Sequence, residues 1–65
     1  MKLRKLSPHL YEGTYRGYHL EIRHLAHGVW VAWIDGQAEH FASLDHARRE
    51  CRRVLDYAEP KKAHA

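Results

Sequence analysis

Residues 29–36 read VWVAWIDG, and this stretch decides the fold. Its first six residues are β-branched or aromatic apart from one alanine, a composition that favours strands. The Asp-Gly pair that follows is the strongest short hairpin signal, because a type I′ turn needs positive φ at both central residues. The stretch therefore predicts a strand over 29–34 and a tight turn at Asp35-Gly36.

The neighbouring segments continue the antiparallel pattern. Tyr18, Leu20 and Ile22 alternate with polar residues, which predicts a half-buried strand. His27-Gly28 supplies the turn between that strand and the next one, since glycine adopts positive φ readily. Residues 37–41 are predicted to return as a short, polar third strand at the edge of the sheet.

One amphipathic helix is predicted after the strands. Ser43 is a good N-cap, Asp45 favours the positive end of the helix dipole, and Pro60 marks the stop. Its apolar residues recur at spacings of three and four, at Leu44, Ala47, Cys51, Val54, Leu55 and Ala58. We therefore predict an α+β domain at 14–59, a three-stranded antiparallel sheet packed on one C-terminal helix, with an irregular N-terminal arm at 1–13 and a flexible tail at 60–65.

A single helix can cover only one face of this sheet. Because side chains alternate along a strand, Trp30, Ala32 and Ile34 are predicted to lie under the helix, and a two-residue turn places Trp30 opposite Phe41. The other face would carry Val29, Val31 and Trp33. Either the leucines of the arm (Leu3, Leu6 and Leu10) cover this second face, or it is an interaction surface for another protein or for a second copy in a homodimer.

Length and composition argue against several classes of protein. The chain has 65 residues and one cysteine, so no intrachain disulfide can form, and a lone thiol suits a cytoplasmic location. Nothing near Met1 resembles a signal peptide, and no apolar run approaches the roughly 20 residues that cross a bilayer, so no membrane association is expected. Cys51 paired with any histidine would lack a pocket, since so small a domain has little volume from which to exclude water, which argues against an enzyme. The seven histidines lack the ligand spacing of a zinc site, so neither a metal nor another cofactor is expected.

Arginines form two pairs on the predicted helix, Arg48 with Arg52 and Arg49 with Arg53, each four residues apart. One interpretation is a solvated face with ion pairs inside the helix, such as that of Arg52 with Asp56. The other is phosphate binding, assisted by the basic arm and the net charge of +3.

Three motifs resemble the AP2-type DNA-binding domain and its small bacterial and phage relatives on integrases. They are Tyr15-Arg16-Gly17, Trp30-Val31-Ala32-Trp33-Ile34, and Phe41-Ala42-Ser43-Leu44-Asp45-His46-Ala47. The resemblance spans 15–56 and implies a sheet whose open face enters a DNA groove while the helix packs behind. It implies that Arg16, Arg23, Val31 and Trp33 face the nucleic acid. The family is rich in arginine on this face, where this chain is expected to carry Glu21, Glu39, Val29 and Val31.

The sequence thus predicts a small non-enzymatic binding module. The first hypothesis is an accessory module for DNA or RNA that uses the open sheet face and the basic arm, with Lys2, Arg4, Lys5, Arg16, Arg23 and Trp33 as its binding residues. The alternative is a protein-interaction or homodimerisation module that uses Val29, Val31 and Trp33.

Overall fold

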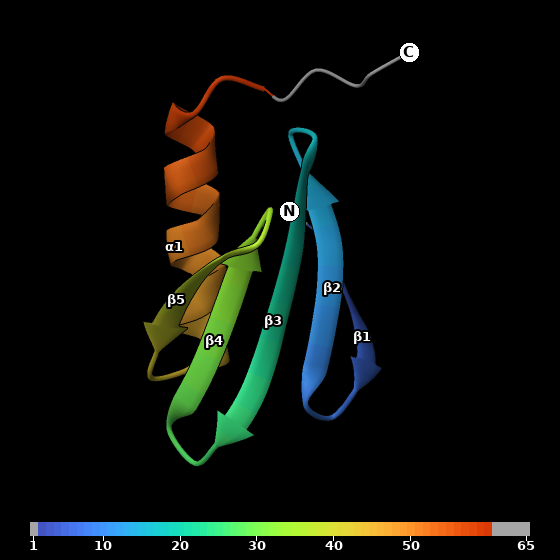
Figure 1. Cartoon of the computed structure of the whole chain (residues 1–65), viewed down its shortest axis with the longest axis vertical. Helices are drawn as coiled ribbons and strands as arrows, with labels where there is room; N and C mark the ends of the chain where they lie inside the picture. The colour runs from blue at the N-terminus through green and yellow to red at the C-terminus, as the bar shows by residue number, and fades with distance from the viewer. Residues whose placement is uncertain (1, 61–65) are drawn as a thin grey trace.

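The computed structural model describes residues 2–60 and consists of one antiparallel sheet with one helix against it (Figure 1). The elements in chain order are β1 (Lys2–Ser7), β2 (Leu10–Tyr15), β3 (Tyr18–Ala26), β4 (Val29–Ile34), β5 (Gln37–Phe41) and α1 (Leu44–Tyr57). Neighbours in the sequence are neighbours in the sheet, so the strand order is β1-β2-β3-β4-β5. The α+β class with one C-terminal helix is confirmed, but the sheet has five strands and not three.

The additional strands come from the segment that was predicted to be an irregular arm. β1 pairs with β2 from Lys2↔Thr14 onward, and β2 pairs with β3 from Leu10↔Arg23 to Tyr15↔Tyr18. Strand β3 would otherwise expose a row of unpaired backbone N–H and C=O groups, which β2 satisfies. Pro8 falls in the turn between β1 and β2, where its missing N–H removes no ladder bond. The arm therefore extends the sheet sideways. Met1 and most of the predicted tail, 61–65, lie outside the described residues.

The predicted hairpin around residues 29–41 is confirmed in detail. Asp35 and Gly36 have φ values of 48° and 89°, as a type I′ turn requires. This two-residue turn fixes the register, so Trp30 pairs with Phe41. The turn between β2 and β3 is of the same kind, with φ values of 53° at Arg16 and 87° at Gly17.

The core lies between the helix and the middle strands of the sheet. Ile22, Ala32, Ala47 and Cys51 form its buried centre, and Leu20 and Leu55 are also buried. Partly buried residues surround this centre: Leu3, Tyr11, Trp30, Ile34, Phe41 and Leu44. The predicted positions of Trp30, Ala32 and Ile34 on the helix side of the sheet are therefore confirmed. Val54, predicted to belong to the buried stripe, is instead 47% exposed because it lies on the flank of the helix.

The two ends of α1 are held by different kinds of contact. At the start, the Ser43 hydroxyl accepts a hydrogen bond from the His46 amide at 3.2 Å, which confirms Ser43 as the N-cap. At the far end, the turn between β2 and β3 supplies donors. The Tyr15 hydroxyl donates to Asp56, Arg16 Nη2 donates to the Ala58 carbonyl at 3.0 Å, and the Tyr18 hydroxyl donates to the Glu59 carbonyl at 2.9 Å. The hydrogen bond to Asp56 also raises the pKa of Tyr15. The last turn of α1 has no basic side chain of its own, so these donors bind the end of the helix instead.

We expect Arg16→Ala to lower the free energy of unfolding by about 1 kcal/mol, because an exposed hydrogen bond from a charged donor is lost. Arginine and alanine are equally unfavourable at the positive φ of position 16, so the substitution leaves the conformational free energy of the backbone unchanged. In a domain of this size the loss corresponds to a fall in Tm of roughly 4–8 °C. Thermal unfolding followed by circular dichroism measures it, and an unchanged Tm would show that the contact contributes nothing.

Candidate nucleic-acid interface

The face of the sheet that points away from the helix carries most of the charged side chains of the strands. The register assigns to this open face Lys2, Arg4, Leu10, Glu12, Thr14, His19, Glu21, Arg23, Val31, Trp33, Ala38 and His40. All five strands contribute, so residues far apart in the sequence become neighbours. Cations and carboxylates alternate across it instead of forming a single basic patch.

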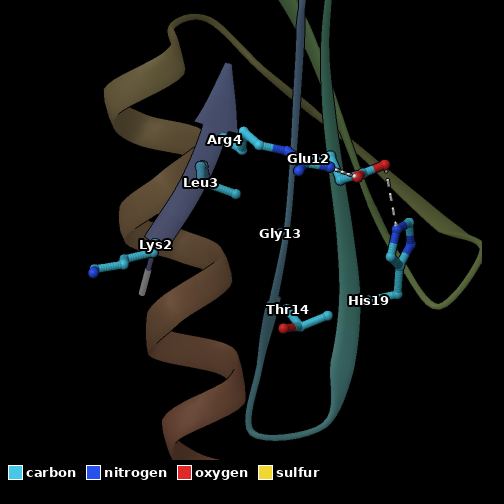
Figure 2. Close-up of a pocket in the computed structure, with 7 residues that line it drawn as sticks. All are labelled: Lys2, Leu3, Arg4, Glu12, Gly13, Thr14 and His19. Carbon is cyan, nitrogen blue, oxygen red and sulfur yellow. Dashed lines mark hydrogen bonds and ion pairs between the residues drawn. The ribbon is translucent and has the colours of Figure 1, made fainter. Parts of the chain in front are cut away.

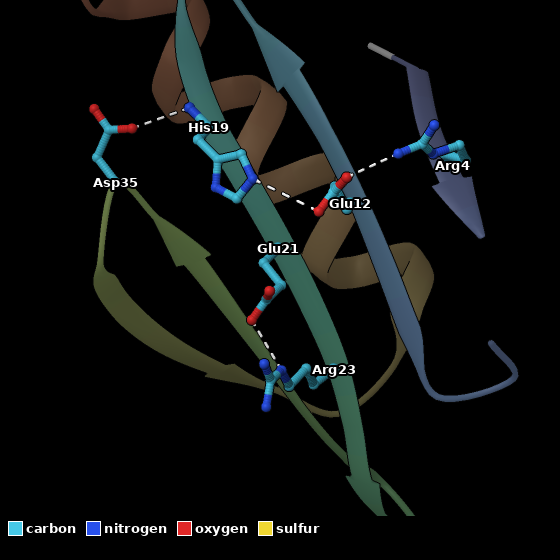
Figure 3. Close-up of polar contacts among 6 residues, drawn as sticks. All are labelled: Arg4, Glu12, His19, Glu21, Arg23 and Asp35. Atoms are coloured by element: carbon cyan, nitrogen blue, oxygen red, sulfur yellow. Dashed lines mark hydrogen bonds and ion pairs between the residues drawn. The ribbon is translucent and has the colours of Figure 1, made fainter. Parts of the chain in front are cut away.

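One chain of polar contacts crosses three strands of the open face (Figure 3). Arg4 Nη2 on β1 donates to Glu12 Oε1 on β2 at 3.0 Å, and His19 Nε2 on β3 lies 3.9 Å from the other carboxylate oxygen of Glu12. The backbone amide of His19 donates to Asp35 Oδ1 at 3.0 Å, which joins β3 to the turn after β4. The Arg4 side chain remains 74% exposed. Glu12 thus orients a guanidinium that is still open to a ligand.

A second group centres on Arg23 of β3. Its Nε donates to Glu21 Oε2 at 2.8 Å, and its guanidinium carbon lies 5.6 Å from the centre of the Trp33 ring on β4. This distance is within the range of a cation–π interaction. Neither Nη of Arg23 has a hydrogen-bond acceptor within residues 2–60, and the side chain is 51% exposed. Glu21 therefore binds the Nε of Arg23, while the Nη donors of the guanidinium face solvent.

The predicted interaction surface of three apolar residues is much smaller than expected. Val31 is only 2% exposed, lying between Arg23 and His40 in the register, so it is inaccessible to a partner. The Trp33 ring lies beneath the Arg23 guanidinium. Val29 is 37% exposed. Arg23 and His40 on the neighbouring strands flank Val31, and the arm extends the sheet sideways instead of folding over this face.

The structure brings together four of the six predicted nucleic-acid-binding residues. Lys2, Arg4, Arg23 and Trp33 all lie on the open face. Lys5 lies on the helix side, where its Nζ is 6.0 Å from the centre of the Tyr11 ring. Arg16 lies at the turn beside the end of α1 and is engaged with the Ala58 carbonyl.

Sequence reasoning missed the contribution of β2 and misplaced one carboxylate. Glu12 and the histidines of the open face, His19 and His40, received no role. Glu12 could not be placed because its strand was not foreseen. Glu39 was expected on the open face beside Glu21, but it pairs with Ala32 and so lies on the helix side. The hairpin register, which already placed Phe41 on that side, contained the signal that assigns Glu39 correctly.

Three of the helix arginines form ion pairs within the helix, as the first interpretation predicts. Arg49 Nε lies 3.2 Å from Asp45 Oδ2, Arg52 Nε lies 3.8 Å from Asp56 Oδ2, and Arg53 Nε lies 2.6 Å from Glu50 Oε2. These carboxylates, spaced three or four residues from their arginines, offset most of the positive charge of the helix. The open sheet face is therefore a better candidate for anion binding than α1.

Other kinds of site find little support within residues 2–60. They contain no group of three or more histidine, cysteine, aspartate or glutamate side chains placed to hold a metal ion. Burial, followed by the charges of Glu39 and Glu50, raises the pKa of Cys51, which disfavours the reactive thiolate. In the same part of the chain, α1 is too short and too polar to cross a bilayer.

Comparison of the chain with known proteins identifies no related protein. No family model, no curated protein and no solved structure matches the chain significantly. The class that the fold and the site define is thus a small α+β domain with an open, charged sheet face.

Proposed function

We propose that the protein is a non-enzymatic module that binds DNA or RNA through the open face of its sheet. The observation that supports this most directly is the pair of exposed arginines, Arg4 and Arg23, each oriented by a carboxylate on the same face. A guanidinium fixed in this way has lost part of its conformational freedom, so less entropy is lost when it binds a phosphate. The chain is also basic, with an isoelectric point of about 9.3.

The chemistry of this face is that of phosphate recognition. The ring of Trp33 is occupied by Arg23, so it is not free to stack on a base. The donors that remain belong to Lys2, Arg4 and Arg23. Because Glu12 and Glu21 offset part of their charge, we expect dissociation constants in the micromolar range typical of non-specific binding, about 10⁻⁶–10⁻⁴ M. We further propose that the protein acts as an accessory module on a nucleic acid, in the reducing interior of a cell.

Fluorescence anisotropy with a labelled DNA duplex, and with an RNA duplex of the same sequence, tests this proposal. Three phosphate contacts predict that the logarithm of the association constant falls with that of the salt concentration with a slope of about −2.7, or roughly 40-fold between 50 and 200 mM salt. Absence of binding at the lower salt concentration contradicts the proposal. Equally tight binding of polyglutamate would show a general affinity for polyanions, which contradicts it as well.

A further inference from the structure

A groove runs along the free edge of β5, on the helix side of the sheet. It has a volume of about 530 Å³, and its lining comes mainly from β4, β5 and the flank of α1, with Tyr18 and Ala58 at one end. Phe41 and Val54 provide apolar surface, while Glu39, Glu50 and Arg53 provide charge. The proposed nucleic-acid interface lies on the opposite face of the sheet, so the groove is a separate surface.

The backbone of β5 offers hydrogen bonds at this groove. Ile34 and Gln37 close a two-residue turn, so they form a hydrogen-bonded pair, and such pairs alternate along an antiparallel ladder. Gln37, Glu39 and Phe41 consequently bond back to β4, whereas the N–H and C=O groups of Ala38 and His40 point outward. No other segment of residues 2–60 forms backbone hydrogen bonds with them. The edge is therefore unpaired.

The two edges of the sheet differ in how they resist pairing with another chain. The β1 edge carries Lys2, Arg4 and Lys5, and its register is interrupted between Lys5 and Ser7. Charged side chains and irregular pairing are the usual protection of an exposed edge strand. β5 contains neither lysine nor proline, and all of its residues pair with β4 without interruption. Of the two edges, β5 is the one suited to accept an additional strand.

The charges along the groove favour a basic ligand. Glu50 is paired with Arg53, but Glu39 has no ion-pair partner within residues 2–60. Glu39 lines the groove from β5, and Glu50 lines it from α1. Val54, one helical turn after Glu50, is exposed and apolar. A cation near Glu39 and an apolar side chain near Phe41 would complement this surface.

We propose that the β5 edge binds an extended peptide segment of another protein, which adds a sixth strand to the sheet. Backbone hydrogen bonds to Ala38 and His40 hold the segment, and alternate side chains enter the groove between β5 and α1. The side chain opposite Glu39 is lysine or arginine, and the one opposite Phe41 is apolar. These two positions are two residues apart in the ligand, so they point to the same side.

Two labelled synthetic peptides test this proposal with the full chain. Both have threonine at every second position; between the threonines one has alternating lysine and valine, and the other has alternating glutamate and valine. We expect the lysine peptide to bind at least about tenfold more tightly, because like charges repel the other one at Glu39. Its binding should slow amide hydrogen exchange at Ala38 and His40. Equal affinities, or protection outside β5, would overturn the proposal.

Variants of β5 separate the backbone contribution from the charge. Ala38→Pro removes an outward N–H without removing a bond to β4, so we expect it to abolish peptide binding, while Ala38→Ser retains the donor and the affinity. Glu39→Gln leaves the backbone intact and should reduce the preference for lysine, whereas Glu59→Gln, outside the groove, should not. Unchanged binding by both Ala38→Pro and Glu39→Gln would rule the site out. A homodimer in sedimentation that Ala38→Pro dissociates would make a second copy the occupant and overturn the assignment to another protein.

Discussion

Arg23→Glu is expected to reduce affinity for a DNA duplex by at least about tenfold at 50 mM salt and to make the salt slope shallower by about one unit. The substitution removes the guanidinium that lies over Trp33 and places a second carboxylate beside Glu21. Both changes make the open face more negative where a phosphate would lie. Anisotropy titrations at several salt concentrations measure the affinity and the slope together.

Lys5→Glu is the matched control for this variant. It changes the net charge by the same amount, but Lys5 lies on the helix side of the sheet, over Tyr11. We expect it to change the affinity far less than Arg23→Glu does. Both residues are exposed, and surface ion pairs contribute only about 0–1 kcal/mol, so both variants should remain folded. If Lys5→Glu weakens binding as much as Arg23→Glu, binding follows net charge alone and the open face is not the interface.

The part of the fold that the sequence predicts is the part with strong local signals. The turn at Asp35-Gly36 dictates its own geometry and the pairing of Trp30 with Phe41, and Ser43 marks the start of the helix. Trp33 could be assigned to the open face from alternation within its own strand, whereas Arg23 was assigned to it by the resemblance to the AP2-type domain.

The strands β1 and β2 could not be predicted in this way because their residues give conflicting local signals. Leu3 and Leu6 are three apart, which breaks the alternation of a strand, and the Glu12-Gly13 pair has weak strand preference. These strands form because β3 offers an edge that β2 satisfies, which is a tertiary effect. The contact between Arg4 and Glu12 depends on that pairing, so the sequence could name Arg4 as a binding residue but could not place Glu12 beside it.

Gly13→Val should detach β1 from the sheet. Leu3 of β1 lies against Gly13 of β2 (Figure 2), and a Cβ added at Gly13 would fall 2.4 Å from the backbone oxygen of Lys2 and 3.2 Å from Leu3 Cδ2. The first of these contacts is too close for any Cβ, and a backbone atom cannot move away as a side chain can. Because β1 is an edge strand, its separation from β2 is the simplest relief.

The expected cost is a large fraction of the total stability. Exposing Leu3, which packs against the buried centre, forfeits about 1.5–3 kcal/mol, while domains of this size rarely exceed roughly 3–5 kcal/mol in all. Urea unfolding measures the loss, and Thr14→Val, the next residue on the exposed face, is the control that should change stability by less than about 0.5 kcal/mol. Detached β1 also takes Lys2 and Arg4 out of the open face, so nucleic-acid affinity should fall along with stability, whereas peptide binding at the distant β5 edge should persist in the folded fraction. Slow amide exchange in β1 of the Gly13→Val protein would contradict this account.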